Sequence, residues 1–189
     1  MNIVLFGPQG SGKGTQALLL CQKYGLFYFE SGAYLRKVAE TNPDLKKSLD
    51  LGNLVPDKEM TSYLTAFFDE KNLYDDILFD GFPRTIEQYY FFKKWLVGKQ
   101  VKLDLGIVLE ISEEETIKRL LLRKRDDDTP EAIKKRLLLY RNRTEVLINE
   151  IKKDTKVIEV NGERSIEAIQ EDLISIIEDV KIVEGMKNG

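Results

Sequence analysis

Short runs of apolar residues recur along the chain, separated by longer segments in which apolar residues are three or four positions apart. The short runs read as buried strands and the longer segments as helices. Strands that alternate with helices favour a parallel sheet covered on both faces. The pattern therefore predicts an α/β fold. The five expected strands are 3–6, 27–29, 77–79, 105–111 and 156–160.

Three places carry the signature of a helix start. Ser112 precedes Glu115 in a capping-box pattern, Thr129 stands before a proline, and Ser165 precedes the last apolar-periodic segment. Serine and threonine side chains satisfy the free N–H groups of a first helical turn, and proline fits the first helical position. Another helix is expected over 15–24, directly after a glycine-rich turn.

Composition narrows the class of function. The chain has 189 residues, 42% apolar and 32% charged, which suits an ordinary globular domain with room for a small insertion. Twenty-nine basic against thirty-two acidic residues give a net charge of -3, so we expect neither a nucleic-acid nor a membrane partner. The amino-terminal apolar run is too short for a signal peptide, and a cytoplasmic location is expected.

The chain has a single cysteine, Cys21, and no histidine. A disulfide within one chain and a thiolate zinc site are thereby excluded, and Cys21 is expected to be a buried small hydrophobe. Without histidine, the commonest general base is missing. The chemistry must therefore depend on other groups.

Residues 7–13, Gly-Pro-Gln-Gly-Ser-Gly-Lys, fit the phosphate-loop pattern and lie between an expected strand and an expected helix. In such a loop, backbone N–H groups face phosphate oxygens, the helix dipole adds to the attraction, and the lysine supplies a positive charge. The alternative is a glycine-rich turn without a ligand. The hydroxyl that usually follows the lysine is displaced by one position, because Gly14 comes before Thr15.

Two strings together resemble the adenylate kinases and their nucleoside monophosphate kinase relatives. One is 10–16, Gly-Ser-Gly-Lys-Gly-Thr-Gln, with its displaced threonine, and the other is 79–85, Phe-Asp-Gly-Phe-Pro-Arg-Thr. The resemblance implies a P-loop kinase fold with a five-stranded parallel sheet in the order 2-3-1-4-5. It also implies that ATP is bound by Gly10, Ser11, Gly12, Lys13, Gly14 and Thr15.

The resemblance implies Mg²⁺ as cofactor. Asp80 follows the third expected strand, where a carboxylate can order the water molecules of a Mg²⁺ ion opposite a phosphate loop, with no direct protein ligand expected. AMP is implied as the second substrate. Its expected contacts are Ser31, Gly32, Arg36, Asn53, Leu54, Val55, Gly81, Phe82, Pro83, Arg84, Gln88, Arg125 and Arg136.

Two positions bear on the AMP side. Ala33 stands where the family has an aspartate, so one polar link of the relatives is missing. Gln88 matches the glutamine that contacts adenine in the family, whereas pyrimidine kinases tend to carry asparagines after the arginine. AMP is therefore expected rather than CMP or UMP.

Arg119 and Arg123 are four residues apart and share one face of an expected helix. Read from composition alone, they belong to a solvated face with paired glutamates. The resemblance instead assigns both to ATP, together with Arg164 in the loop after the last strand. It names Lys13, Arg84, Arg123, Arg125 and Arg136 as the catalytic set. Several guanidinium groups can stabilise a metaphosphate-like transition state without proton transfer.

The main departure from the family is at 123–128, where only Lys124 separates two arginines that a lid separates in relatives. We expect a core domain over 1–29 and 60–189, an AMP-binding subdomain over 30–59, and a vestigial lid at 123–128. A monomer is the default, and a homo-oligomer is the alternative if a neighbouring subunit replaces the lid. The expected reaction is ATP + AMP to 2 ADP. The alternatives are a kinase for CMP, UMP or GMP, and a non-catalytic nucleotide-binding module.

Overall fold

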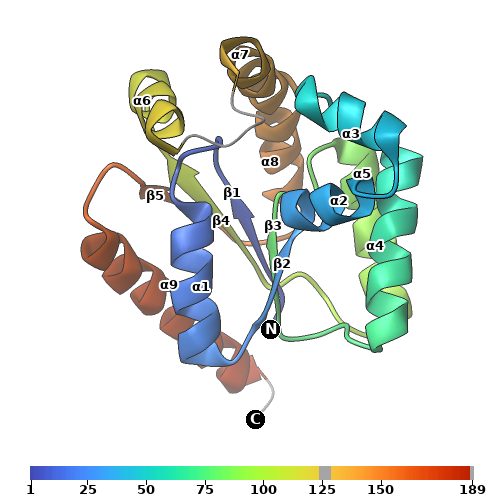
Figure 1. Ribbon diagram of the computed structural model, residues 1–189. Helices are drawn as coiled ribbons and strands as arrows, with labels where there is room; N and C mark the ends of the chain where they lie inside the picture. Colours follow the sequence, from blue (N-terminus) through green and yellow to red (C-terminus); the bar gives the residue numbers. More distant parts are fainter. Residues whose placement is uncertain (124–128, 188–189) are drawn as a thin grey trace.

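The computed structural model describes residues 1–123 and 129–187 and has a central sheet between layers of helices (Figure 1). Five parallel strands lie in the order β2-β3-β1-β4-β5. The predicted α/β class and strand order are confirmed. The strands are β1 (Ile3–Phe6), β2 (Phe27–Glu30), β3 (Ile77–Asp80), β4 (Leu105–Glu110) and β5 (Val157–Asn161).

Helices connect the strands. Three of them, α2 to α4, lie between β2 and β3. The segment 30–59, where a subdomain is expected, contains α2 and α3 but only the first turn of α4. A π-helical turn η1 separates α7 from α8. The helical elements of the described residues are α1 (Lys13–Tyr24), α2 (Ser31–Ala39), α3 (Pro43–Asp50), α4 (Asp57–Lys71), α5 (Ile86–Gly98), α6 (Glu113–Arg123), α7 (Pro130–Leu139), η1 (Tyr140–Thr144), α8 (Glu145–Ile151) and α9 (Ile166–Lys187).

The predicted helix starts are confirmed by side-chain caps. The Ser112 hydroxyl accepts a hydrogen bond from the N–H of Glu115 at 3.3 Å. Thr129 and Ser165 cap α7 and α9 in the same way at 3.2 Å. Each cap satisfies an N–H that the first turn leaves without an intrahelical partner. These caps fix where α6, α7 and α9 begin.

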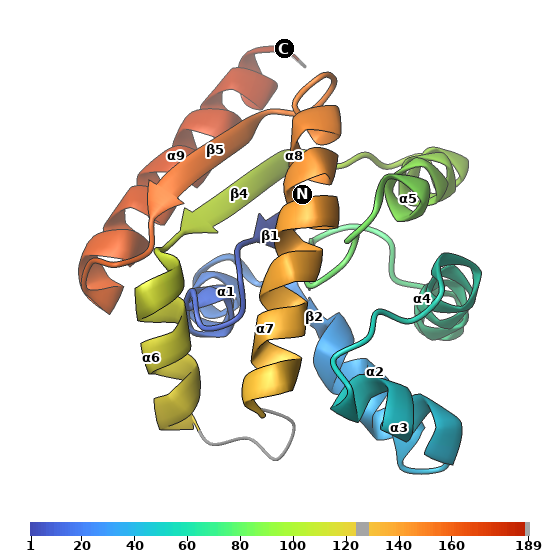
Figure 2. The ribbon, with the colours of Figure 1, turned by 90° about the horizontal axis from the view of Figure 1, so that it is seen from above.

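The strands send alternate side chains into two separate cores. In β1, Ile3 and Leu5 belong to the core beneath α1 and α9, whereas Val4 and Phe6 belong to the core beneath α4, α5 and α8. All four residues of β1 are buried, as expected for the central strand of a parallel sheet. Figure 2 shows α1 and α9 on one side of the sheet and α5 and α8 on the other.

Contacts between aromatic rings pack α4 and α5 against the sheet. Phe29 in β2 lies with its ring centroid 4.9 Å from that of Phe68 in α4. Phe79 in β3 makes a T-shaped contact with Phe92 in α5, also at 4.9 Å. Such pairs add to the hydrophobic stabilisation that burial supplies. The rings hold α4 and α5 against the carboxyl half of β2 and β3.

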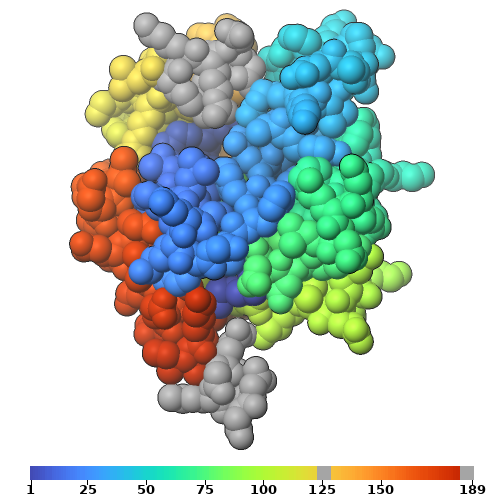
Figure 3. All heavy atoms as spheres, turned by 60° about the horizontal axis from the view of Figure 1, so that its bottom comes forward, coloured from blue at the N-terminus to red at the C-terminus, as the bar shows by residue number. Residues whose placement is uncertain are grey.

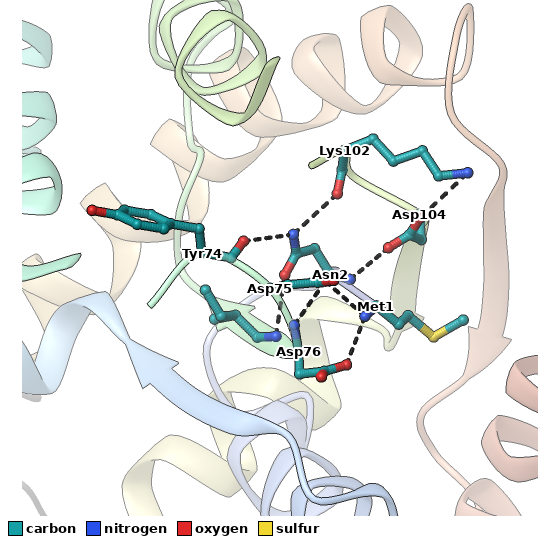
Figure 4. A network of polar contacts seen from close by, with 8 residues as sticks. Met1, Asn2, Tyr74, Asp75, Asp76, Lys102 and Asp104 are labelled. Carbon is teal, nitrogen blue, oxygen red and sulfur yellow. Dashed lines mark hydrogen bonds and ion pairs between the residues drawn. The ribbon is translucent and has the colours of Figure 1, made fainter. Parts of the chain in front are cut away.

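Asn2 joins the amino ends of three strands (Figure 4). Its side-chain amide donates to the carbonyl oxygens of Tyr74 at 3.0 Å and Lys102 at 3.1 Å, and its Oδ1 accepts from the N–H of Ile77 at 3.1 Å. The backbone N–H of Asn2 donates to Asp104 Oδ2 at 2.6 Å. Asn2 is fully buried, so each of these bonds replaces a lost contact with water.

The surface follows the same layering. In the space-filling view, α9 in orange and red lies along one flank, α1 in blue lies beside it, and the light-blue to green segment that holds α2 to α4 forms the other flank (Figure 3). None of the helices in the described part of the chain combines the length and apolar character that a membrane span needs.

Candidate functional site

The glycine-rich loop lies between the end of β1 and the start of α1, as the sequence predicts. Gly7, Gly10 and Gly12 have positive φ angles, which let the loop turn sharply around its own backbone. The turn is closed by a hydrogen bond from the N–H of Ser11 to the carbonyl oxygen of Pro8 at 3.2 Å. The loop leads directly into the amino end of α1, where free backbone N–H groups can attract an anion.

Lys13 is folded back onto this loop. Its ammonium donates to the carbonyl oxygens of Gly7 at 2.7 Å and Pro8 at 2.9 Å, and lies 3.4 Å from the hydroxyl oxygen of Ser11. The positive charge is thus held over the turn where a phosphate would be cradled.

Asp80 ends β3, beside the loop. It is buried, and its Oδ2 accepts a hydrogen bond from the hydroxyl of Tyr28 at 3.0 Å. Burial raises the pKa of Asp80, the charge of Lys13 opposes that shift, and the charge of Glu30 adds to it. Among the described residues, no three acidic or thiol side chains cluster closely enough to hold a metal ion.

A pocket lies between α2, α3 and α5, on the side predicted for AMP. Most of the predicted AMP contacts line it, which brings together residues from four separate segments of the chain. Phe82 and Pro83 are buried beside it. The predicted residues that line this pocket are Gly32, Arg36, Asn53, Leu54, Val55, Gly81, Arg84, Gln88 and Arg136.

A second pocket contains Lys13 and the start of the glycine-rich loop. It shares five residues with the first pocket, and two of them are arginines. The two pockets are therefore adjacent, and two guanidinium groups lie where they meet. The shared residues are Gln9, Leu54, Gly81, Arg84 and Arg136.

Arg84 and Arg136 are held by the residues around them. Arg84 Nε donates to the carbonyl oxygen of Gly81 at 2.7 Å. Arg136 donates to Gln9 Oε1 and to the carbonyl oxygen of Leu49, each at 3.3 Å. The bond of Arg84 is short and the two bonds of Arg136 are long, and together they orient both guanidinium groups from within the protein.

The charge around Arg84 favours an anion. Burial lowers the pKa of Arg84, Asp80 and Glu30 oppose the shift, and the positive charges of Arg136 and Arg36 add to it. The three guanidinium groups repel one another, and a phosphate beside them would relieve the repulsion.

Ser31 and Arg36 are anchored at the start of α2. The Ser31 hydroxyl donates to the carbonyl oxygen of Gly81 at 2.7 Å, and Arg36 Nη2 donates to Glu30 Oε1 at 3.0 Å. Ala33 is exposed and contributes no carboxylate. The acidic partner of Arg36 is therefore Glu30, at the end of β2, a residue that the sequence analysis did not single out.

The arginines assigned to ATP lie in different surroundings. Arg119 pairs with Glu115 at 2.7 Å and also donates to the carbonyl oxygen of Gly162 at 3.0 Å, so it combines the surface pairing with a position beside the loop. Arg164 is exposed and ion-paired with Asp172. The side chain of Arg123 and the whole of residues 124–128, where the sequence predicts a vestigial lid and Arg125 lies, fall outside the described residues.

Known proteins are similar to this chain in sequence. The family model for adenylate kinase matches residues 5–156. An adenylate kinase of Bacteroides thetaiotaomicron is 36% identical over 186 residues, covering 94% of this chain and 98% of the relative. One of Corynebacterium aurimucosum is 37% identical over 175 residues, covering 90% and 96%. One of Mycolicibacterium smegmatis is 36% identical over 166 residues, covering 86% and 92%.

The matched region contains the glycine-rich loop, Asp80 and the two pockets that meet at Arg84 and Arg136. Fold, motifs and relatives therefore agree, and the chain belongs to the adenylate kinase family of phosphotransferases, which convert ATP and AMP to two molecules of ADP.

Proposed function

We propose that ATP binds with its phosphates on the glycine-rich loop and that AMP binds in the pocket lined by Arg36 and Gln88. The observation that carries this proposal is the junction of the two pockets at Arg84 and Arg136. A donor phosphate near Lys13 and an acceptor phosphate near Arg36 would face each other across that junction. In-line transfer needs such a geometry.

The proposed transfer is a direct displacement at the γ-phosphorus, stabilised by positively charged side chains. The AMP phosphate oxygen attacks the γ-phosphorus of ATP, the bond to the β-phosphate oxygen breaks, and ADP forms on both sides. Lys13, Arg84 and Arg136 stabilise the negative charge that spreads over the transferring group, and we assign the same part to Arg123 and Arg125. Fixed charges of this kind act without reorganising during the reaction. No covalent enzyme intermediate is involved.

We assign the ordering of Mg²⁺ to Asp80. A bound Mg²⁺ neutralises phosphate charge and holds the phosphate oxygens in line. Asp80 is acidic, buried and close to Lys13, which suits a carboxylate that orders the hydration shell of an ion. Gly10, Ser11, Gly12, Gly14 and Thr15 complete the ATP side in this proposal, with Arg119 and Arg164 toward the adenine.

A further part of the proposal concerns how the ATP site is covered. With one residue between Arg123 and Arg125, the chain is too short there for a covering lid. We propose a cytoplasmic monomer, and a sedimentation mass of two or more chains would favour cover by a neighbouring subunit instead. ADP or phosphate release from ATP in the absence of AMP would reveal how far water enters.

The proposal is tested by ADP formation from ATP with AMP, CMP, UMP or GMP as acceptor, with and without Mg²⁺. We expect turnover that is selective for AMP, depends on Mg²⁺ and falls about 10²- to 10³-fold in Lys13→Ala. Lys23→Ala is the matched control, because Lys23 is an exposed lysine on the same helix. Preference for another monophosphate would refute the assignment of Gln88, and full activity of Lys13→Ala would refute that of Lys13.

A further inference from the structure

Both ends of the Gln88 side-chain amide are engaged in hydrogen bonds. Its Oε1 accepts from the backbone N–H of Arg84 at 2.8 Å, and its Nε2 donates to Asp57 Oδ1 at 2.8 Å. Gln88 is 2% exposed, yet it lines the pocket proposed for AMP. Its orientation is therefore set by neighbours within the protein and not by solvent.

The two neighbours admit only one orientation of the amide. A backbone N–H can only donate, so it must face the amide oxygen, and an ionised carboxylate can only accept, so it must face the amide nitrogen. Thr85 reinforces this arrangement, because its hydroxyl donates to the same Asp57 Oδ1 at 2.9 Å. A rotated amide would set its oxygen against the carboxylate and its NH₂ group against the N–H of Arg84.

Asp57 has a defined place in the fold, at the start of a helix. It is the first residue of α4, directly after Pro56, and the amino end of a helix stabilises negative charge. Thr85 is the N-cap of α5 and accepts from the N–H of Gln88 at 3.2 Å. Asp57 thus ties the start of α4 to the start of α5, where Gln88 stands.

The fixed amide leaves one N–H of Nε2 and one lone pair of Oε1 without a partner in these bonds. Adenine presents an acceptor at N1 and a donor at N6, which complement this pair of groups. A 6-oxopurine presents the reverse, a donor at N1 and an acceptor at O6. Correct reading of the base thus requires the orientation that Asp57 and Arg84 impose on Gln88.

We propose that Asp57 is a positioning residue for base selectivity: by holding the Gln88 amide in one orientation, it makes the site favour adenine over a 6-oxopurine. The inference rests on the proposed function, in which Gln88 faces the base of the acceptor nucleotide. Asp57 itself does not line the pocket and acts through Gln88.

The test compares AMP with inosine 5′-monophosphate (IMP), which differs from AMP only in the groups at positions 1 and 6 of the purine. The ratio of kcat/KM for AMP to kcat/KM for IMP is measured with Mg-ATP for the unchanged protein and for Asp57→Ala. We expect the ratio to fall on the order of tenfold in Asp57→Ala. The substitution removes the hydrogen bond to the Asp57 carboxylate and leaves only the bond from the N–H of Arg84 to orient the amide.

Asp57→Asn is the conservative control. Its Oδ1 can still accept from both Gln88 and Thr85, so we expect the ratio to stay within about twofold of the unchanged protein. Asp57→Ser, with a smaller polar side chain at the start of α4, provides a second disrupting variant if Asp57→Ala does not fold. A merely structural role for Asp57 would lower turnover of AMP and IMP together and leave the ratio unchanged, which would overturn the inference.

Gln88→Ala separates failure of the inference from failure of the proposed function. A ratio that falls in Gln88→Ala but not in Asp57→Ala or Asp57→Ser would overturn the inference alone. A ratio that does not change in Gln88→Ala would overturn the assignment of Gln88 to the base and, with it, the role of Asp57.

Discussion

Gly52 packs directly against the backbone of Ala132, which joins the end of α3 to the first turn of α7. A Cβ atom on Gly52 would lie 3.0 Å from the carbonyl oxygen of Ala132 and 3.3 Å from its Cα. One turn further along α7, Arg136 donates to the carbonyl oxygen of Leu49. The same contact surface thus positions the AMP-side pocket and an arginine at the pocket junction.

Gly52→Ala should therefore disturb both stability and AMP binding. The φ of Gly52 is +71°, where an L-residue is strained by about 1–2 kcal/mol, and the added methyl group also has to displace backbone atoms. We expect the KM for AMP to rise several-fold with a smaller change in the KM for ATP. Urea unfolding and steady-state kinetics measure the two effects.

Gly25→Ala is the matched control for that variant. Gly25 has a φ of +70°, and nothing lies within 4 Å of the position its Cβ would take. It carries the same backbone strain without the contact, so its loss of stability should be smaller and its KM for AMP unchanged. Equal effects of the two substitutions would mean that the contact with Ala132 has no part in AMP binding.

Arg136→Ala should abolish most phosphoryl transfer. Arg136 borders both pockets and is held there by Gln9 and Leu49, and a central arginine in phosphoryl transfer contributes about 10³- to 10⁵-fold to the rate. The loss should appear in kcat, because the charge that it stabilises is greatest in the transition state. Single-turnover measurements at saturating ATP and AMP check this.

Arg141→Ala is the control for charge alone. Arg141 is an exposed arginine a short distance along the chain, in η1, and pairs with Glu113. Its removal should change kcat less than about threefold, in keeping with the small contribution of exposed ion pairs. Comparable losses in both variants would point to general electrostatic attraction and away from a specific position for Arg136.

The fold could be predicted because its signals are local. Apolar runs mark the strands, and Ser112, Thr129 and Ser165 mark helix starts through bonds to N–H groups three residues away. The strand ends differ from the predicted ones by at most one residue. For example, β3 includes Asp80, because the parallel pairing with Glu30 continues to that point. Pairing between strands is a tertiary contact that apolar patterning does not reveal.

The site could be predicted only in part, because it also depends on contacts between segments that are distant in the sequence. The motifs indicated Lys13, Arg84 and Gln88, but Glu30 and Asp57 act through contacts with residues up to 31 positions away. Asp57 follows a proline at a helix start, which is a common capping arrangement and gives no hint of the amide it faces. Such partners emerge only when the fold brings the segments together.

Asn2→Asp should destabilise the protein by about 2–4 kcal/mol, because a carboxylate cannot donate to the carbonyl oxygens of Tyr74 and Lys102 and both partly buried bonds are lost. The nearby carboxylate of Asp104 adds repulsion. Urea unfolding at neutral pH measures the change. Asn149→Asp is the control, since Asn149 is exposed on α8 and the same change there should cost less than about 0.5 kcal/mol.

The single thiol offers a pH-dependent test of the packing around α1. Cys21 is half-buried, and burial raises its pKa from 9.0 to about 11, because the thiolate loses hydration that the thiol does not need. Only the thiolate is alkylated, so at pH 8 iodoacetamide should react about 100-fold more slowly with the folded protein than with the urea-unfolded protein. Between pH 8 and 10 the folded rate should rise about tenfold per pH unit, whereas the unfolded rate should level off near pH 9.

Since the chain has no other cysteine, the amount of label reports this site alone. The Gly25→Ala variant provides a further check, because Gly25 caps the carboxyl end of α1 through its N–H bond to the carbonyl oxygen of Cys21 at 2.9 Å. Loosening that cap should expose the thiol and speed alkylation at pH 8. Equal rates in the folded and unfolded protein would show instead that the thiol is as well hydrated in the native state as in the free chain, and that the core beneath α1 and α9 does not shield it.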